Sequence, residues 1–299
     1  MPIDRRFFVA GAGAFLAQPI QASTPVAIPI SLDARRIRVP VMLNGHGPIT
    51  MALDSGGVVS LLDTRFVQSQ NLPKRGSIRL GMGGREGIFD TVTADLVVGN
   101  ALRISNMLFG STSRIQFGAN IVGSLGAGFL TNGASELDFD QSVWRFLSTG
   151  ITDLPGYTRL PSAIVKGRSG TFLFVDAMLN GVGVRLAVDT GYPSMIRLTP
   201  AAQSRTGLDR SGLATRPQTV RGHPAGSAVY CDRTQIGGID LGRTIVARAN
   251  RANPVFQDGL LGLALLRQLN MVINPARGEL WIRRNGLAGG RDDGSPVEL

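Results

Sequence analysis

The chain has 299 residues, which is long enough for two lobes of ordinary domain size, each with its own core. Its composition, 43% hydrophobic and 17% charged residues, is that of a globular protein and excludes a low-complexity chain. The net charge of +10 comes almost entirely from arginines that are scattered without a dense basic block, so we expect no nucleic-acid partner.

Residues 1–22 are typical of an export signal rather than of the fold. Arg5 and Arg6 stand just before two apolar residues, a weakly apolar run over residues 9–17 follows, and the small residue Ala22 comes after it. Paired arginines before such a run resemble a twin-arginine signal, and the run is too short and glycine-rich to span a bilayer stably. We expect export to the periplasm or the extracellular space and no stable membrane span. A disordered or anchoring N-terminus is the alternative.

Short runs rich in Val, Ile and Leu, bounded by Gly, Pro, Asn or Asp, predict a mostly β protein. The first clear unit is a hairpin whose strands, 37–43 and 48–54, flank Asn44-Gly45, a strong signal for a tight turn. Its second strand ends at Asp54. Further strands are expected at residues 28–32, 58–63, 102–109 and 121–126, and a short helix at 64–70 with Asp63 or Thr64 as its cap.

Two more hairpins complete the first half. Residues 78–80 and 87–98 flank the glycine-rich stretch 81–84, which predicts a projecting hairpin that is a candidate flap over a cleft. Residues 137–140 and 143–146 form the terminal hairpin.

The second half repeats this order. A hairpin joins residues 172–179 and 184–189 through Asn180-Gly181, and it ends at Asp189. The remaining expected elements are a strand at 195–198, a helix starting at 199–202, a looser hairpin over 220–230, strands at 239–246 and 258–262, and a terminal hairpin of 271–274 with 279–282.

The spacing of matching features indicates an internal duplication. The two aspartates are 189 − 54 = 135 residues apart, and Gly126 and Gly262 are 262 − 126 = 136 apart. We therefore predict an N-terminal lobe at 31–150, a C-terminal lobe at 160–285 and an unstructured tail at 286–299. The boundary falls in the loosely composed stretch 148–162.

The cysteine and histidine content excludes several kinds of site. Cys231 is the only cysteine, so an intramolecular disulfide and a cysteine-rich metal site are ruled out. His46 and His223 are the only histidines and lie in no ligand-spaced motif, and no Gly-x-Ser-x-Gly sequence follows a strand. We expect no cofactor or metal, and we interpret the histidines as loop residues and Cys231 as a small buried apolar residue.

The duplicated tripeptides Asp54-Ser55-Gly56 and Asp189-Thr190-Gly191 are the candidate site. One copy alone suits any turn after a strand, whereas two copies in matched lobes predict two carboxyls meeting at a pseudo-twofold axis. Such a pair shares one proton, so that one member activates water while the other polarises a carbonyl. The hydroxyls of Ser55 and Thr190 are expected to hydrogen-bond across the interface.

With these motifs the chain resembles a two-lobed, retropepsin-like aspartic peptidase of bacterial type, over roughly residues 31–284. The resemblance implies two homologous all-β barrel lobes with a few short helices, a cleft between them and extended peptides as substrates. It also implies that Asp54 and Asp189 are the catalytic dyad, supported by Ser55, Gly56, Thr190 and Gly191. Behind the dyad it implies an apolar-apolar-Gly element in each lobe, made by Leu125 and Gly126 and by Leu260, Leu261 and Gly262.

Three positions depart from the pattern of that family. Ser55 stands where threonine is commoner, and the hairpin over residues 79–90 has no tyrosine, which brings the chain closer to retroviral-type enzymes. Tyr192-Pro193 follows the second motif where Gly57 follows the first. The two sides of the site are therefore not equivalent. We interpret Trp144 and Trp281, in the terminal hairpins, as packing residues.

The main functional interpretation is an exported aspartic endopeptidase acting on peptides or proteins. A non-catalytic protein that keeps the fold and binds extended peptides between its lobes is the alternative, and a basic surface-binding module is a more distant one. Because the duplication supplies both aspartates in one chain, we expect a monomer.

Overall fold

The structure is a computed structural model in which most of the chain from residue 26 onward is described. The described residues are 26–33, 35–82, 85–99, 102–115, 117–126, 128–131, 133–147, 154–161, 163–167, 170–220, 223–249, 256–287 and 297–298. The predicted export signal at residues 1–22 lies outside them. Within the described residues, no helix is both long and apolar enough to cross a membrane.

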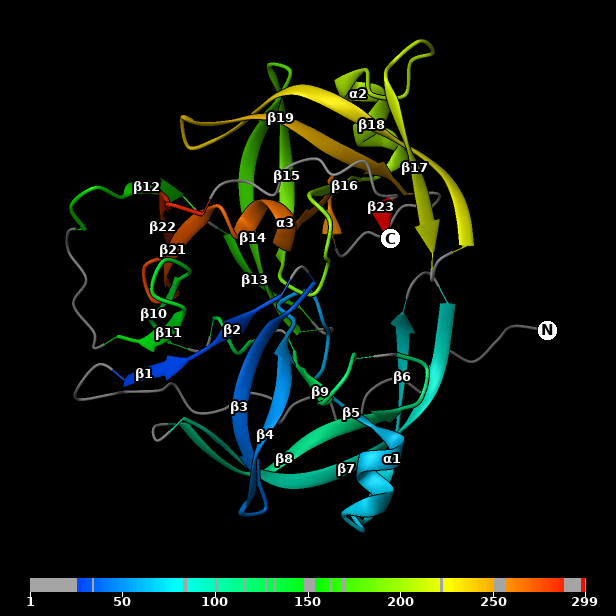
Figure 1. The fold of residues 1–299 in the computed structure, drawn as a ribbon, viewed down its shortest axis with the longest axis vertical. Coiled ribbons are helices and arrows are strands. Elements are labelled where there is room, and N and C mark those ends of the chain that lie inside the picture. Colours follow the sequence, from blue (N-terminus) through cyan, green and yellow to red (C-terminus); the bar gives the residue numbers. More distant parts are fainter. Residues whose placement is uncertain are drawn as a thin grey trace, which may run out of the picture.

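An eight-stranded sheet forms the N-terminal lobe (Figure 1). The sheet folds back on itself toward a barrel, because β3, near one end of the strand order, pairs with its neighbour β4 and also with β7, near the other end. The short helix α1 (Thr64–Ser69) follows β5. In spatial order the strands are β2 (Ser31–Leu32), β3 (Ile37–Leu43), β4 (His46–Leu53), β9 (Ile121–Leu125), β5 (Leu61–Asp63), β8 (Leu102–Thr112), β7 (Arg85–Val98) and β6 (Lys74–Met82).

The C-terminal lobe repeats this plan in a nine-stranded sheet, above the first in Figure 1. Here β14 plays the part of β3, because it pairs with β15 and also with β18. Two helices belong to this lobe, α2 (Pro200–Thr206) and α3 (Leu263–Leu266). In spatial order the strands are β13 (Ala163–Gly167), β14 (Gly170–Leu179), β15 (Val182–Asp189), β20 (Gly259–Gly262), β16 (Ile196–Leu198), β19 (Ile239–Arg248), β18 (His223–Ile236), β17 (Thr215–Val220) and β23 (Val297–Glu298).

A third sheet, of six strands, joins the two lobes at the left of Figure 1. At its centre the terminal hairpins of the two halves meet, with Ser135 opposite Ile273 and Leu137 opposite Met271. The buried Asn270 reinforces this junction, since its side chain accepts a bond from the Phe139 N–H at 3.0 Å. In spatial order the strands are β1 (Val26–Pro29), β11 (Val143–Phe146), β10 (Ser135–Asp138), β21 (Leu269–Asn274), β22 (Glu279–Arg284) and β12 (Thr158–Pro161).

Side-chain alternation along β3 shows how the sequence builds the core. Residues 37, 39, 41 and 43 are buried, while the residues between them are partly exposed. This is the period of two expected for a strand with one face on the core. Trp144 and Trp281 are both buried, which confirms their interpretation as packing residues, and Trp144 stacks at 4.7 Å on Phe146. Cys231 is buried as predicted.

The helix ends follow the predicted capping residues. The Asp63 carboxylate accepts a hydrogen bond from the Arg65 N–H at 2.7 Å, and helix α1 begins at the next residue after this cap. Helix α2 begins at Pro200 behind the cap Thr199, whose hydroxyl accepts a bond from Ala202. It ends at Gly207, whose φ of 69° lies in the left-handed region that glycine adopts without strain.

Several predicted boundaries were wrong because pairing with distant segments decides them. The strand expected at 58–63 is formed only over Leu61–Asp63, and the strand expected at 28–32 is divided between β1 and β2, which belong to different sheets. The looser hairpin expected at 220–230 has long arms, β17 and β18. The predicted boundary stretch contains β12, which pairs with β22.

Two further differences concern residues expected outside regular structure. In the tail expected to be unstructured, Val297 and Glu298 form β23, which pairs with β17. His46 and His223, interpreted as loop residues, are the first residues of β4 and β18.

Candidate active site

The two predicted aspartates lie at equivalent ends of equivalent strands. Asp54 directly follows β4, and its N–H bonds to the Leu125 carbonyl of the parallel strand β9 at 2.8 Å. Asp189 is the last residue of β15 and is in register with Gly262 of the parallel strand β20. In both lobes a buried strand therefore carries its aspartate to the place where the chain turns.

The hydroxyl residues after the aspartates bond across the lobes, as expected. The Thr190 hydroxyl accepts from the Ser55 N–H at 3.0 Å and donates to the Leu53 carbonyl at 2.8 Å. The Ser55 hydroxyl accepts from the Thr190 N–H at 3.0 Å and donates to the Val188 carbonyl at 2.7 Å. These four reciprocal bonds are buried and hold the two loops in one arrangement.

The glycines after the hydroxyl residues bring each carboxyl against the opposite lobe. A Cβ atom on Gly56 would overlap the Asp189 carboxyl, and a Cβ atom on Gly191 would overlap the Asp54 carboxyl. Only glycine leaves room for this close approach. The two carboxyl groups therefore lie side by side across the interface.

Backbone N–H groups point at each carboxyl group. The Asp189 carboxylate accepts from the Gly191 N–H at 2.9 Å and from the Tyr192 N–H at 3.1 Å. Asp54 is contacted in the same way by the N–H groups of Gly56 and Gly57. Backbone donors therefore orient each carboxyl group, and the Gly56 N–H contacts both of them.

Burial raises the pKa of both aspartates, and the charge of Asp54 raises the pKa of Asp189 further. The pKa of Asp189 rises from 3.8 to about 7, first because the group is buried and then because of the neighbouring charge of Asp54. Burial also raises the pKa of Asp54, against the opposing effects of the Arg36 guanidinium and of the Gly57 and Gly56 N–H groups. A pair of this kind holds a single proton over a wide pH range.

The predicted apolar-apolar-Gly elements pack behind the two loops. A Cβ atom on Gly126 would lie 2.8 Å from the Ser60 backbone nitrogen, and the Gly126 N–H bonds to the Ser60 hydroxyl at 2.9 Å. In the other lobe Gly262 approaches Tyr192 so closely that a Cβ atom would lie 2.7 Å from its carbonyl oxygen. The residues before these glycines, Leu125, Leu260 and Leu261, are buried.

The glycine-tipped hairpin is present as β6 and β7, with Ile78 opposite Phe89. Leu80 of this hairpin packs, together with Val59, against the apolar cluster that contains Ala52 and Leu61. The hairpin therefore lies beside the loop that carries Asp54. Its role as a flap stays a prediction.

Sequence reasoning missed one charged residue of the site, Arg36. Its guanidinium interacts electrostatically with both Asp54 and Asp189, and burial lowers its pKa. The signal was present in the first hairpin, because counting outward from the Asn44-Gly45 turn brings residue 36 close to residue 54.

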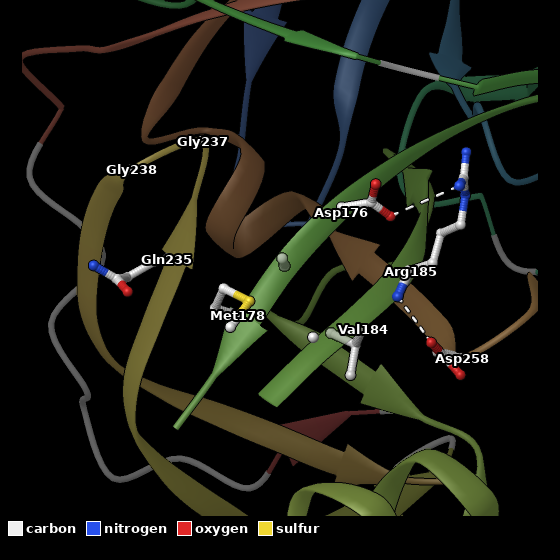
Figure 2. Close-up of a pocket in the computed structure, with 10 residues that line it drawn as sticks. Asp176, Met178, Val184, Arg185, Gln235, Gly237, Gly238 and Asp258 are labelled. Carbon is white, nitrogen blue, oxygen red and sulfur yellow. Dashed lines mark hydrogen bonds and ion pairs between the residues drawn. The ribbon is translucent and has the colours of Figure 1, made fainter. Parts of the chain in front are cut away.

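A separate pocket of about 480 Å³ lies in the C-terminal lobe and contains neither aspartate of the pair (Figure 2). One of its carboxylates is already paired, since Asp258 accepts a hydrogen bond from the backbone N–H of Arg185 at 2.8 Å and also meets the Arg205 guanidinium at 2.7 Å. The lining residues are Asp176, Ala177, Met178, Gly183, Val184, Arg185, Gln235, Gly237, Gly238 and Asp258.

The chemistry available at the paired aspartates is proton transfer between two oxygen acids. One carboxylate can take a proton from water while the neighbouring carboxylic acid gives one to a carbonyl oxygen. Within the described part of the chain, no three side chains of His, Cys, Asp or Glu gather as metal ligands would.

Comparison with known proteins agrees with this geometry. Residues 175–265, which include Asp189, match the family described as aspartyl protease. No curated protein matches the chain.

Two similar solved structures cover nearly the whole chain. The aspartic proteinase from Irpex lacteus has 13% sequence identity and a TM-score of 0.58, over 91% of this chain and 100% of that one. Basic 7S globulin from soybean has 12% identity and a TM-score of 0.58, over 90% of this chain and 96% of that one. These likenesses show the two-lobed pepsin-like fold.

Proposed function

We propose that this chain, whose residues 175–265 match the aspartyl protease family, is an endopeptidase that hydrolyses peptide bonds with water activated between Asp54 and Asp189. One observation supports the proposal above all others. Two carboxyl groups from separate lobes are held side by side by four reciprocal hydrogen bonds, so they form a pair that shares a proton.

The reaction follows from that shared proton. The ionised carboxylate takes a proton from water as the water oxygen bonds to the carbonyl carbon of the substrate. The protonated carboxyl gives its proton to the carbonyl oxygen, which yields a neutral diol. The C–N bond then breaks as the proton taken from water passes to the nitrogen, and a diol hydroxyl returns a proton to the other carboxyl. The pair ends the cycle with one proton, as it began.

The substrate we propose is an extended peptide segment of a protein or peptide, bound between the lobes. The duplication supplies both carboxyls in one chain, and we therefore propose that the monomer is active.

The test is incubation of the full chain with a mixture of peptides between pH 3 and pH 8, with products identified by mass spectrometry in H₂¹⁸O. We expect internal cleavage with one ¹⁸O atom in each new carboxyl group, because water attacks the carbonyl directly. Cleavage should be absent in Asp54→Asn and Asp189→Asn. Cleavage that survives either substitution would contradict the proposed pair.

The alternative function is binding of extended peptides without cleavage. It is favoured by the second similar structure, which is named a globulin and not a proteinase and shares the fold over 90% of this chain. The same experiment separates the two: a peptide that is retained by wild-type protein and recovered intact at every pH supports binding alone.

We also propose that the protein is exported, from the paired arginines and the weakly apolar run in residues 1–22. When the full chain is produced in bacteria, we expect a shortened, folded form outside the cytoplasm. Replacing both Arg5 and Arg6 by lysine should leave the protein in the cytoplasm at full length. Equal export of the two proteins would refute a twin-arginine route.

A further inference from the structure

The residue that lies opposite each aspartate differs in charge between the two lobes. It belongs to the segment that pairs with the strand leading to the aspartate. In the N-terminal lobe, β3 pairs with β4 so that Arg38 lies opposite Ala52. Continuing this antiparallel register by two residues places Arg36 opposite Asp54. Residues opposite each other in a sheet project their side chains to the same face, a few ångströms apart. Arg36 and Asp54 are both partly buried, and Ser55, the residue after Asp54, is buried.

The equivalent position in the C-terminal lobe is a phenylalanine. There β14 pairs with β15 so that Phe174 lies opposite Ala187, and the same two-residue continuation places Phe172 opposite Asp189. The spacing 172 − 36 = 136 is that of the internal repeat. Phe172 is buried and meets Phe256 edge to face at 5.8 Å. The position opposite Asp54 is therefore an arginine, next to β3, and the position opposite Asp189 is a phenylalanine, in β14; Figure 1 labels both strands.

From this asymmetry we propose that Arg36 is a positioning residue that keeps the negative charge of the pair on Asp54 and the proton on Asp189. The inference rests on the proposed function and deepens it. Asp54 is then the base that takes the proton from water, and Asp189 is the acid that gives its proton to the carbonyl oxygen. The guanidinium bonds to no substrate atom in this account, and it acts only through the charge of its neighbour.

The charged groups around the pair support this assignment. On the side of Asp54 they are Arg36, Arg35 and Asp33, and the last two also act on Arg36. Arg38, on the same face of β3, is already paired with Asp33 at 2.6 Å. A guanidinium beside a carboxylate favours its ionised form, and Arg36 indeed lowers the pKa of Asp54 against the effect of burial.

The charged groups around Asp189 favour its protonated form more than those around Asp54 do. Its largest charged neighbour is Asp54, which raises its pKa. Arg36 also interacts electrostatically with Asp189, but less than with Asp54. The Tyr192 side chain is buried, and Arg197 acts on Tyr192. The geometry thus gives the proton a preferred carboxyl before any substrate binds.

The test is the pH dependence of kcat/KM, whose acid limb reports the ionisation of the free enzyme. Removing the positive charge raises the pKa of Asp54, so Asp54 stays protonated to higher pH. In Arg36→Gln we therefore expect the acid limb to move upward by about one pH unit. Arg36→Phe, which copies the equivalent residue of the other lobe, should shift it in the same direction. Arg36→Lys keeps the charge and should shift it by less than half as much.

Arg35→Gln is the matched control, because it removes one charge from the neighbouring exposed residue. We expect its acid limb to move by less than about 0.3 pH units, as an exposed charge is weakened by solvent. Equal shifts in Arg35→Gln and Arg36→Gln, or an equal shift in Arg36→Lys, would overturn the assignment to Arg36.

A second measurement separates this inference from the proposed function. The carboxyl ¹³C signal of Asp54, identified by its loss in Asp54→Asn, can be titrated in the absence of substrate. Its midpoint should rise in Arg36→Gln and stay near the wild-type value in Arg36→Lys. If the wild type cleaves no peptide, the proposed function fails, while this titration still decides whether Arg36 holds the charge on Asp54. An unchanged midpoint in Arg36→Gln refutes the inference.

Discussion

Replacing Asp189 by asparagine is expected to abolish peptide hydrolysis and, at the same time, to make the folded protein more stable at pH 8. Activity should fall by about 10³-fold or more, since the variant loses the proton donor of the pair. The asparagine side chain has nearly the same shape, and its oxygen can still accept the bonds from Gly191 and Tyr192. The fold should therefore survive the loss of function.

The gain in stability follows from the raised pKa of Asp189. Its value of about 7 in the folded protein lies 7 − 3.8 = 3.2 units above the ordinary value. A group whose pKa is raised on folding contributes stability that is complete below pH 4 and is lost as the pH rises through 7. At 1.36 kcal/mol per pKa unit, the free energy of unfolding of the wild type falls by as much as about 4 kcal/mol by pH 8. Asp189→Asn has no such group to ionise and does not lose this stability.

Urea unfolding of wild type and Asp189→Asn at pH 4 and pH 8 measures this effect. We expect the variant to be more stable only at pH 8. Asp176→Asn is the control, because this exposed aspartate of the same lobe meets Arg185 at the long distance of 3.9 Å, and it should change stability by less than about 0.5 kcal/mol at both pH values. A stability difference that is the same at both pH values would show that folding does not raise the pKa of Asp189.

The duplication and the aspartates were readable from the sequence because local signals fix them. Asn44-Gly45 and Asn180-Gly181 each adopt the positive φ angles of a tight turn, with φ of 49° and 78° in the first and 48° and 83° in the second. A two-residue turn brings its two strands into antiparallel pairing. With one register shift between Val41 and Leu43 in the first hairpin and none in the second, each hairpin delivers its aspartate to an equivalent place. Repetition of this pattern at one spacing predicted two like lobes.

The six-stranded sheet was out of reach of the same reasoning. Its pairs join residues far apart in the chain, such as Val26 with Phe146 and Ser135 with Ile273. The pattern of buried and exposed residues tells which face of a strand meets the core, but not which partner its edge selects. For the same reason β12 and β23 were predicted as boundary and tail.

Arg36 was missed for a related reason. A single arginine before a strand looks like any other in a chain with 31 lysines and arginines. Its importance depends on the register between β3 and β4 and on Phe172 at the equivalent position of the other lobe. Comparing the two halves position by position, with attention to where they differ in charge, would have found it.

The second large effect is expected from Thr190→Val, which removes one hydroxyl and keeps the side-chain shape. Thr190 is fully buried, and the variant leaves the Ser55 N–H and the Leu53 carbonyl without their partner. A buried polar group without a partner costs about 1–3 kcal/mol, so we expect a loss of about 2–4 kcal/mol for the two. Activity should fall by about 10²-fold, because the two loops no longer hold the carboxyls in register.

Thr190→Ser is the matched control for that variant, since it keeps the hydroxyl and loses only a methyl group, at a cost of about 1 kcal/mol. Urea unfolding and kcat/KM should both place it close to wild type and far from Thr190→Val. Ser55→Ala removes the reciprocal hydroxyl and should behave like Thr190→Val. Because the two residues bond to each other's backbone, the double variant should lose less than the sum of the single losses. Strict additivity, or a Thr190→Ser variant as inactive as Thr190→Val, would show that the cross-lobe bonds do not position the aspartates.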